Sequence, residues 1–251
     1  MSKVIAVTGK GGTGKTTVVS LIIKHLKAHA QGTILALDAD PDSNLATVLG
    51  VPLEMSIGQL REETLKEMKN FPPGMDKSNY IEAGLHQIIC ETDKMDFIAM
   101  GRSEGPGCYC YINSLLRKFA DDLQSSYDWV IMDNEAGLEH LSRRTAARVD
   151  HLITIINNTP LSIDCARRVQ DLLGGISNEV RKKHYIINNV NSEKVSIIKE
   201  RCADLDMEYL GCIPPDPELE DAIFNGKPLF ELDTTPAVLS INEMMDKIKE
   251  K

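Results

Sequence analysis

The sequence lacks any apolar stretch of about 18 residues, the minimum that indicates a membrane-spanning helix. The apolar run near its start ends at Gly9 and is too short for the apolar part of a signal peptide. The sequence also has no excess of basic residues. It contains 28 lysines and arginines and 37 aspartates and glutamates, which gives a formal net charge of −9. That balance disfavours a protein that binds by neutralising nucleic-acid phosphates or anionic lipids. We therefore expect a soluble cytoplasmic protein that binds neither nucleic acid nor membrane.

The chain shows no internal repeat, linker or low-complexity segment, so its 251 residues predict one domain over residues 1–251. Short apolar runs rich in β-branched residues alternate with amphipathic segments of helical length. Most of these runs are continuously apolar, as strands buried on both faces are. The pattern predicts a single-domain α/β fold whose mostly parallel sheet carries helices on both faces.

The predicted elements are read from these runs. The strands are Val4–Val7, Thr33–Leu37, Asp96–Met100, Trp129–Met132, His151–Ile156, His184–Ile187 and Tyr209–Ile213. The helices are Lys15–Ala28, Asn113–Ser125, Leu138–Val149, Ile163–Leu173, Glu193–Ala203 and Pro236–Lys249. The stretch from Met55 to Lys94 is the least regular, and we expect helices appended between strands there.

The first predicted strand runs into a glycine-rich segment that matches G-x-x-x-x-G-K-[ST], a phosphate-binding loop. Backbone N–H groups of such a loop and the start of the following helix surround phosphate oxygens. Lys15 is expected to reach the β- and γ-phosphates, and the Thr16 hydroxyl to bind Mg²⁺. The residues predicted to bind the nucleotide here are Gly9, Gly11, Gly12, Thr13, Gly14, Lys15, Thr16 and Thr17.

A dinucleotide site is the alternative, because the same loop also matches G-x-G-x-x-G and Asp38 ends the second strand. Three features disfavour it. The pair Lys15 and Thr16 has no role in a dinucleotide fold, and a second acid, Asp40, follows at the same strand end. Asp133 ends a later apolar strand and can supply a carboxylate to Mg²⁺. Together they favour a nucleoside triphosphate.

With Lys10 included, the loop resembles the deviant Walker A motif of the MinD/ParA/nitrogenase-iron-protein superfamily, and the resemblance covers nearly the whole chain. It implies an ATP-bound homodimer in which Lys10 reaches the nucleotide of the partner. The segment Asp38–Asp42 resembles switch I, which implies that Asp40 orients the attacking water. Asp38 and Asp42 are expected only to cap a turn. The catalytic residues implied are Lys10, Lys15 and Asp40.

Other segments resemble further parts of the same nucleotide site. Asp133 to Gly137 resembles switch II, in which Asp133 serves Mg²⁺ and Gly137 bonds the γ-phosphate. Asn188, at the end of a strand, matches the asparagine that hydrogen-bonds adenine. Pro214 and Asp216 lie in a segment that matches the loop closing over the base.

Cys108 and Cys110 follow a Gly-Pro-Gly turn. In a reducing compartment such a close pair suggests metal binding, but it supplies only half of a tetrahedral site. Two copies related by a twofold axis would supply the other half. Nitrogenase-iron-protein members instead take one cysteine from this loop and one from switch II, where this chain has Ala136. The isolated cysteines, expected to fill core space, are Cys90, Cys165, Cys202 and Cys212.

The Cys-x-Cys pair with a switch II reading DNEAGLEHL resembles the CooC-type ATPases. These insert nickel into carbon monoxide dehydrogenase, and a close branch serves acetyl-CoA synthase. The resemblance implies an ATP-dependent metallochaperone that holds Ni²⁺ (or Zn²⁺) at Cys108 and Cys110 and passes it to one of these apo-enzymes. An iron–sulfur ATPase that transfers electrons and a MinD/ParA-like positioning ATPase stay open as alternatives. An anchoring C-terminal helix is disfavoured, because the stripe Ile241, Met244, Met245 and Ile248 is predicted to pack in the core.

Overall fold

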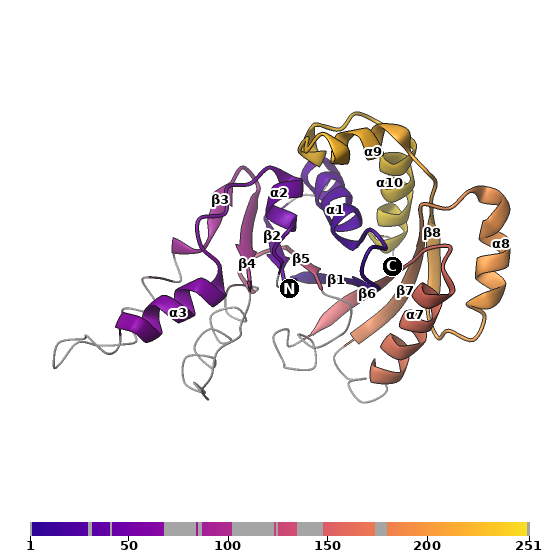
Figure 1. Cartoon of the computed structure of the whole chain (residues 1–251), viewed down its shortest axis with the longest axis horizontal. Coiled ribbons are helices and arrows are strands. Elements are labelled where there is room, and N and C mark those ends of the chain that lie inside the picture. The colour runs from indigo at the N-terminus through magenta and orange to yellow at the C-terminus, as the bar shows by residue number, and fades with distance from the viewer. Residues whose placement is uncertain are drawn as a thin grey trace.

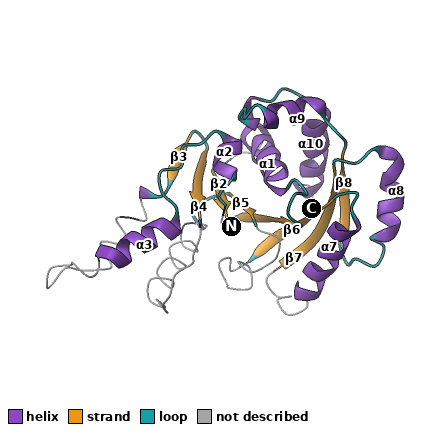
Figure 2. Ribbon diagram, viewed as in Figure 1, coloured by secondary structure: helices purple, strands orange, loops and turns teal. Residues whose placement is uncertain are grey.

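The computed structural model describes residues 2–29, 32–40, 42–67, 84, 87–101, 123, 125–134, 148–173 and 180–249. Its centre is an eight-stranded sheet with the order β3-β4-β2-β5-β1-β6-β7-β8. Every neighbouring pair is parallel except β3 and β4, which form an antiparallel edge. Helices lie on both faces of this sheet (Figures 1 and 2). The predicted α/β architecture is confirmed.

The strands are β1 (Lys3–Gly9), β2 (Ile34–Asp38), β3 (Cys90–Thr92), β4 (Met95–Ala99), β5 (Trp129–Asp133), β6 (Val149–Ile156), β7 (Val180–Asn188) and β8 (Glu208–Ile213). The helices in the described part of the chain are α1 (Lys15–His29), α2 (Leu45–Leu49), α3 (Ile57–Glu67), α7 (Pro160–Leu173), α8 (Ser192–Arg201), α9 (Pro217–Phe224) and α10 (Pro236–Lys249), with a 3-10 turn η1 (Leu229–Glu231).

Every predicted strand is present, and the departures occur where polar residues enter a strand. β7 begins at Val180 rather than His184, because the polar run Arg181–Lys183 pairs with β6 while staying partly exposed. The edge strand β3 is half-exposed and too short to form an apolar run, so it was not predicted. The helix predicted over 138–149 is wrong at its end, since Val149 begins β6. The rest of that segment, and most of the helix predicted over 113–125, lie outside the described residues.

Alternate residues of β1 face the two halves of the core, as the pleat of a strand requires. Ile5 and Val7 lie in a cluster with side chains of α1, α9 and α10. Val4 and Ala6 lie in a second cluster with side chains of α3 and α7. A third cluster joins β7 to α7 and α8. The central strand is therefore covered on both faces, which explains why its sequence is continuously apolar.

The C-terminal helix α10 packs against α1 and β8 (Figure 1). Its apolar stripe is buried, with Ile241, Met244, Met245 and Ile248 all between 1% and 3% exposed. The prediction that this stripe belongs to the core is confirmed. Within the part of the chain that the structure describes, no helix combines the length and apolar character needed to cross a bilayer.

Two buried histidines meet at the pairing of β6 with β7. His151 Nδ1 and His184 Nε2 are 3.0 Å apart, so one hydrogen bond joins the rings. The Glu208 carboxylate lies 3.5 Å from His184 Nδ1. Burial, and after it the charge of Lys182, lowers the pKa of His151 to about 4. At neutral pH the folded protein therefore holds His151 uncharged.

We predict that this arrangement makes the fold sensitive to acid. His151 titrates near 6.5 when unfolded but near 4 when folded, so the unfolded chain binds the extra proton as pH falls through that interval. The free energy of unfolding should therefore fall by about 1–2 kcal/mol, through His151 alone, when the pH is lowered from 7.5 to 5. Urea unfolding at both pH values measures it. In His151→Gln the fall should be smaller by that amount, and an identical pH dependence in the two proteins would contradict the prediction.

Candidate nucleotide site

Parallel pairing brings the carboxyl ends of the central strands to one edge of the sheet, where ligands bind in open α/β folds. Asp38 ends β2 and Asp133 ends β5, and the two are register partners. The glycine-rich loop follows β1 between them and β6. Asn157 follows β6, and Asn188 ends β7. Residues widely spaced in sequence thus surround the first residues of α1.

Two glycines of the loop lie in close contact with neighbouring strands, Gly9 with the backbone of β6 and Gly14 with a side chain of β7. Gly9 has φ +147°, and a Cβ there would lie 2.6 Å from the carbonyl oxygen of Ile155 on β6. Gly14 has φ +90°, and a Cβ there would lie 2.3 Å from Nδ2 of Asn188 on β7. Both conformations also disfavour any side chain. Glycine is therefore required at both positions by β6 and β7 as well as by phosphate.

The loop closes on itself before α1 begins. The carbonyl oxygen of Lys10 accepts hydrogen bonds from the Thr13 backbone N–H at 3.2 Å and from the Thr13 hydroxyl at 2.7 Å. The first helical hydrogen bond runs from Val18 N–H to the Gly14 carbonyl. Lys15, the first residue of α1, is 7% exposed. Its ammonium lies close enough to Asp133 to favour the ionised carboxylate. The segment predicted to bind phosphate therefore forms a compact turn that leads directly into α1.

Asp133 is one of two buried acids at this edge of the sheet, with 1% exposure. No described residue donates a hydrogen bond of ordinary geometry to either of its carboxylate oxygens. Burial raises its pKa to about 6, against the opposing effects of the Thr16 hydroxyl and the Lys15 ammonium. Buried carboxylate oxygens without donors are unfavourable unless a cation or its bound water meets them.

Magnesium fits these residues, because it prefers oxygen ligands and keeps several of its waters beside one or two carboxylates and substrate phosphates. Thr16 offers a hydroxyl and Asp133 a carboxylate. Among the described residues, no group of three or more His, Cys, Asp or Glu side chains is arranged to hold a metal ion. A magnesium ion here would therefore depend on oxygens of the nucleotide.

Asp38 and Asp40, two of the three acids in the segment from Asp38 to Asp42, differ in their surroundings. Asp40 is half-buried, and its Oδ1 accepts a hydrogen bond from Asp42 N–H at 3.0 Å. Asp38 is fully buried and accepts backbone hydrogen bonds with both carboxylate oxygens. Burial, and also the nearby Asp133, raises the pKa of Asp38 to about 7. The capping role expected for Asp38 is present, but its burial beside Asp133 was not foreseen from the sequence.

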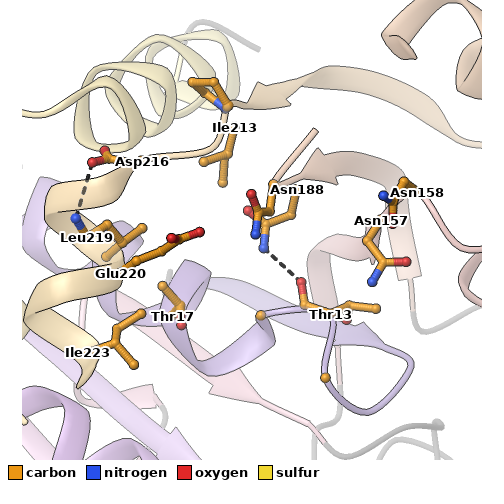
Figure 3. Close-up of a pocket in the computed structure, with 14 residues that line it drawn as sticks. Thr13, Thr17, Asn157, Asn158, Asn188, Ile213, Asp216, Leu219, Glu220 and Ile223 are labelled. Atoms are coloured by element: carbon orange, nitrogen blue, oxygen red, sulfur yellow. Dashed lines mark hydrogen bonds between the residues drawn. The ribbon is translucent and has the colours of Figure 1, made fainter. Parts of the chain in front are cut away.

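A pocket of about 300 Å³ lies beside the loop (Figure 3). Asn188 donates from Nδ2 to the Thr13 carbonyl at 2.8 Å. This bond uses one of the two N–H groups of the amide, whose oxygen is a hydrogen-bond acceptor. The wall is formed by Gly12, Thr13, Gly14, Thr17, Asn157, Asn158, Asn188, Asn189, Ile213, Pro214, Asp216, Leu219, Glu220 and Ile223.

Asp216 lines this pocket and also holds two helices in place. Its Oδ1 accepts from Leu219 N–H at 3.2 Å and caps α9, while its Oδ2 accepts from Ala237 N–H at 2.9 Å at the start of α10. Helix α9, which brings Glu220 to the pocket, was not predicted. An aspartate followed by Pro217 is the usual start signal of a helix and could have revealed it.

Several predicted site residues cannot be placed. Gly137, Cys108 and Cys110 lie outside the described residues. Cys165 and Cys202 are buried, as expected for core cysteines, whereas Cys90 and Cys212 are half-buried.

Comparison with known proteins agrees with this geometry. The family profile described as the CobQ/CobB/MinD/ParA nucleotide binding domain matches residues 4–229. The chain belongs to this family. It is a P-loop ATPase of the superfamily that contains MinD, ParA and CooC, with the fold of MinD and ParA.

The relatives cover almost the whole chain. An uncharacterized ATP-binding protein of Methanocaldococcus jannaschii is 38% identical over 251 residues, 99% of each chain. The carbon monoxide dehydrogenase accessory protein CooC of Rhodospirillum rubrum is 29% identical over 240 residues, 91% of this chain and 89% of its own.

Solved structures show the same fold. A ParA family ATPase from Chlorobium tepidum has a TM-score of 0.71 at 17% identity, covering 97% of this chain and 98% of its own. The MinC:MinD complex of Aquifex aeolicus has a TM-score of 0.70 at 22% identity, covering 100% and 96%.

We predict that Gly14→Ala abolishes tight nucleotide binding. The new Cβ would lie 2.3 Å from Asn188 Nδ2, so either the loop or the base-side amide must move. Affinity for a fluorescent ATP analogue should fall at least about 10-fold, or about 1.4 kcal/mol. Gly226→Ala is the matched control, because Gly226 has φ +64° with no atom within 4 Å of the new Cβ. If both variants bind nucleotide equally well, the close contact has no role.

Proposed function

We propose that this protein hydrolyses ATP to ADP and phosphate in order to load nickel into carbon monoxide dehydrogenase or acetyl-CoA synthase. The observation that carries the proposal is the phosphate loop beside buried Asp133, in a chain that also contains Cys-x-Cys at 108 and 110. It is supported by the relative named as a carbon monoxide dehydrogenase accessory protein, which matches along nearly its full length.

The nucleotide part of the proposal uses residues that lie together. The loop and the start of α1 bind the phosphates, with Lys15 neutralising charge on the transferred group. Thr16 and Asp133 would hold a magnesium ion, which would supply stabilisation of negative charge on the phosphate oxygens. Asn188 hydrogen-bonds adenine through its amide, which its bond to the Thr13 carbonyl orients. Asp40 orients the attacking water from the end of β2, and Lys10 reaches the nucleotide of a second copy.

The metal part of the proposal rests on symmetry. One chain offers two thiolates at Cys108 and Cys110, and two chains offer the four that a tetrahedral site needs. Thiolate ligands suit Ni²⁺ and Zn²⁺. ATP binding brings two copies together around the metal, which is the cargo. Hydrolysis then changes the two switch segments, and the metal passes to the apo-enzyme.

Two features weigh against a positioning ATPase of MinD or ParA type. The apolar stripe of α10 is buried against α1 and is not displayed for a membrane. The formal net charge of −9 opposes non-specific DNA binding.

The metal prediction concerns protein purified without oxygen. We expect one nickel or zinc per dimer, measured by elemental analysis with and without ATP, and its loss in the Cys108→Ser/Cys110→Ser variant. Cys165→Ser/Cys202→Ser is the matched control, because these cysteines are buried in the core and should not affect metal content. Iron with sulfide and visible absorption would replace this proposal by the iron–sulfur alternative. Absence of metal in every state would favour the positioning ATPase.

The hydrolysis prediction separates binding from chemistry. Lys10→Ala and Asp40→Ala should each bind a fluorescent ATP analogue within about 3-fold of the unchanged protein, yet hydrolyse ATP at least about 100-fold more slowly. Phosphate release under saturating Mg-ATP measures the rate. Normal turnover in either variant would refute the role assigned to that residue.

A further inference from the structure

The carboxylate of Asp38 bonds the backbone of the segment that carries Asp40. Its Oδ1 accepts from Asp40 N–H at 3.1 Å, and its Oδ2 accepts from Leu45 N–H at 2.9 Å. Asp38 is 0% exposed, so water does not compete for either bond. One side chain therefore fixes both ends of the connection from β2 to α2.

Helix α2 depends on this distant cap. Asn44 occupies the usual capping position, but its side chain makes no capping hydrogen bond within the described part of the chain. The first helical N–H, that of Leu45, is satisfied by Asp38 instead. Because an unsatisfied N–H is costly when buried, the cap ties the helix start to the end of the strand.

Asp38 itself is held on a rigid base. The Ala39 N–H donates to the carbonyl oxygen of Asp133 at 2.8 Å, and the Met100 N–H donates to the carbonyl oxygen of Asp38 at 2.7 Å. Its backbone is thus bonded toward both β5 and the end of β4. Because the Asp38 backbone is fixed to the sheet, the hydrogen bond from Asp40 N–H to the Asp38 carboxylate fixes the backbone of Asp40 relative to the sheet.

A carboxylate at position 38 is unfavourable for the stability of the fold. Asp38 and Asp133 are register partners, both buried, and burial and their mutual proximity raise the pKa of Asp38. An uncharged capping residue such as asparagine or serine would avoid repulsion with Asp133, but it would not offer two equivalent acceptor oxygens. Locally unfavourable choices of this kind are concentrated at functional sites.

We propose that Asp38 is a positioning residue for ATP hydrolysis, whose carboxylate fixes the switch I backbone so that Asp40 is aligned on the attacking water. The inference rests on the proposed role of Asp40. Asp38 touches neither nucleotide nor water in this mechanism and acts through the two N–H groups that it accepts.

The test begins with Asp38→Asn, which keeps one acceptor oxygen and turns an NH₂ group toward the other backbone N–H. We expect kcat to fall about 10-fold or more, while affinity for a fluorescent ATP analogue stays within about 3-fold. Amide hydrogen exchange at Asp40 and Leu45 should accelerate. Asp93→Asn, in the exposed turn between β3 and β4, is the matched control for charge removal and should leave all three unchanged. Should Asp38→Asn fold poorly, Asp38→Ser removes the charge and keeps one short acceptor.

A double variant identifies the route of the effect. If Asp38 acts through Asp40, adding Asp38→Asn to Asp40→Ala should lower kcat no further. A multiplicative loss would overturn the proposal, as would an unchanged kcat in Asp38→Asn or a parallel loss of affinity and melting temperature. Normal turnover in Asp40→Ala would remove the proposed role of Asp40 and the positioning role together. If Asp40→Ala is slow and the double variant loses kcat by the product of the two single losses, only the positioning role of Asp38 is refuted.

Discussion

The parallel pairing of β2, β5, β1, β6 and β7 is the constraint on which the rest of this structure depends. Because their carboxyl ends meet at one edge, the phosphate loop, two buried acids and two asparagines converge at the start of α1. The loop is then held by β6 and β7, which follow β1 in the order of the sheet. Gly9 packs against β6, and Asn188 of β7 bonds the Thr13 carbonyl. Phosphate and base sites are therefore joined by direct contact.

The acids at this edge are placed where they are costly without a ligand. Asp133 has buried oxygens without a donor of ordinary geometry among the described residues, and Asp38 lies beside it in register. Burial raises the pKa of both carboxyls, to about 6 for Asp133 and about 7 for Asp38. A cation with its bound waters would relieve the repulsion between the two carboxylates. The hydrogen bonds that the buried Asp38 carboxylate accepts from Asp40 and Leu45 would keep Asp40 in place.

Much of the site was predictable because its signals are local. The phosphate loop follows from residue types at fixed spacing, and the central strands follow from continuous apolar runs. Helix α9 and the double use of Asp216 were missed, since one carboxylate serves Leu219 nearby and Ala237 across the chain. The edge strand β3 was missed because half-exposed residues leave no apolar pattern. Asp38 was expected to cap a turn, and only its partner Asp133 explains why that cap is strained.

The sequence by itself determined the class of the protein and predicted which residues bind phosphate, because glycine, lysine and threonine at these spacings are typical of a phosphate-binding loop. It also contained Cys108 and Cys110, whose proposed partnership needs a second chain. Tertiary structure alone decided which residues accompany the loop. Asn157, which follows β6, and Glu220, on α9, line the pocket beside it, and the buried Asp38 lies in register with Asp133. The register between strands sets how deeply an acidic side chain is buried and how far it lies from the next acid. These two quantities determine whether that acid merely caps an exposed turn or is held in place as part of the site.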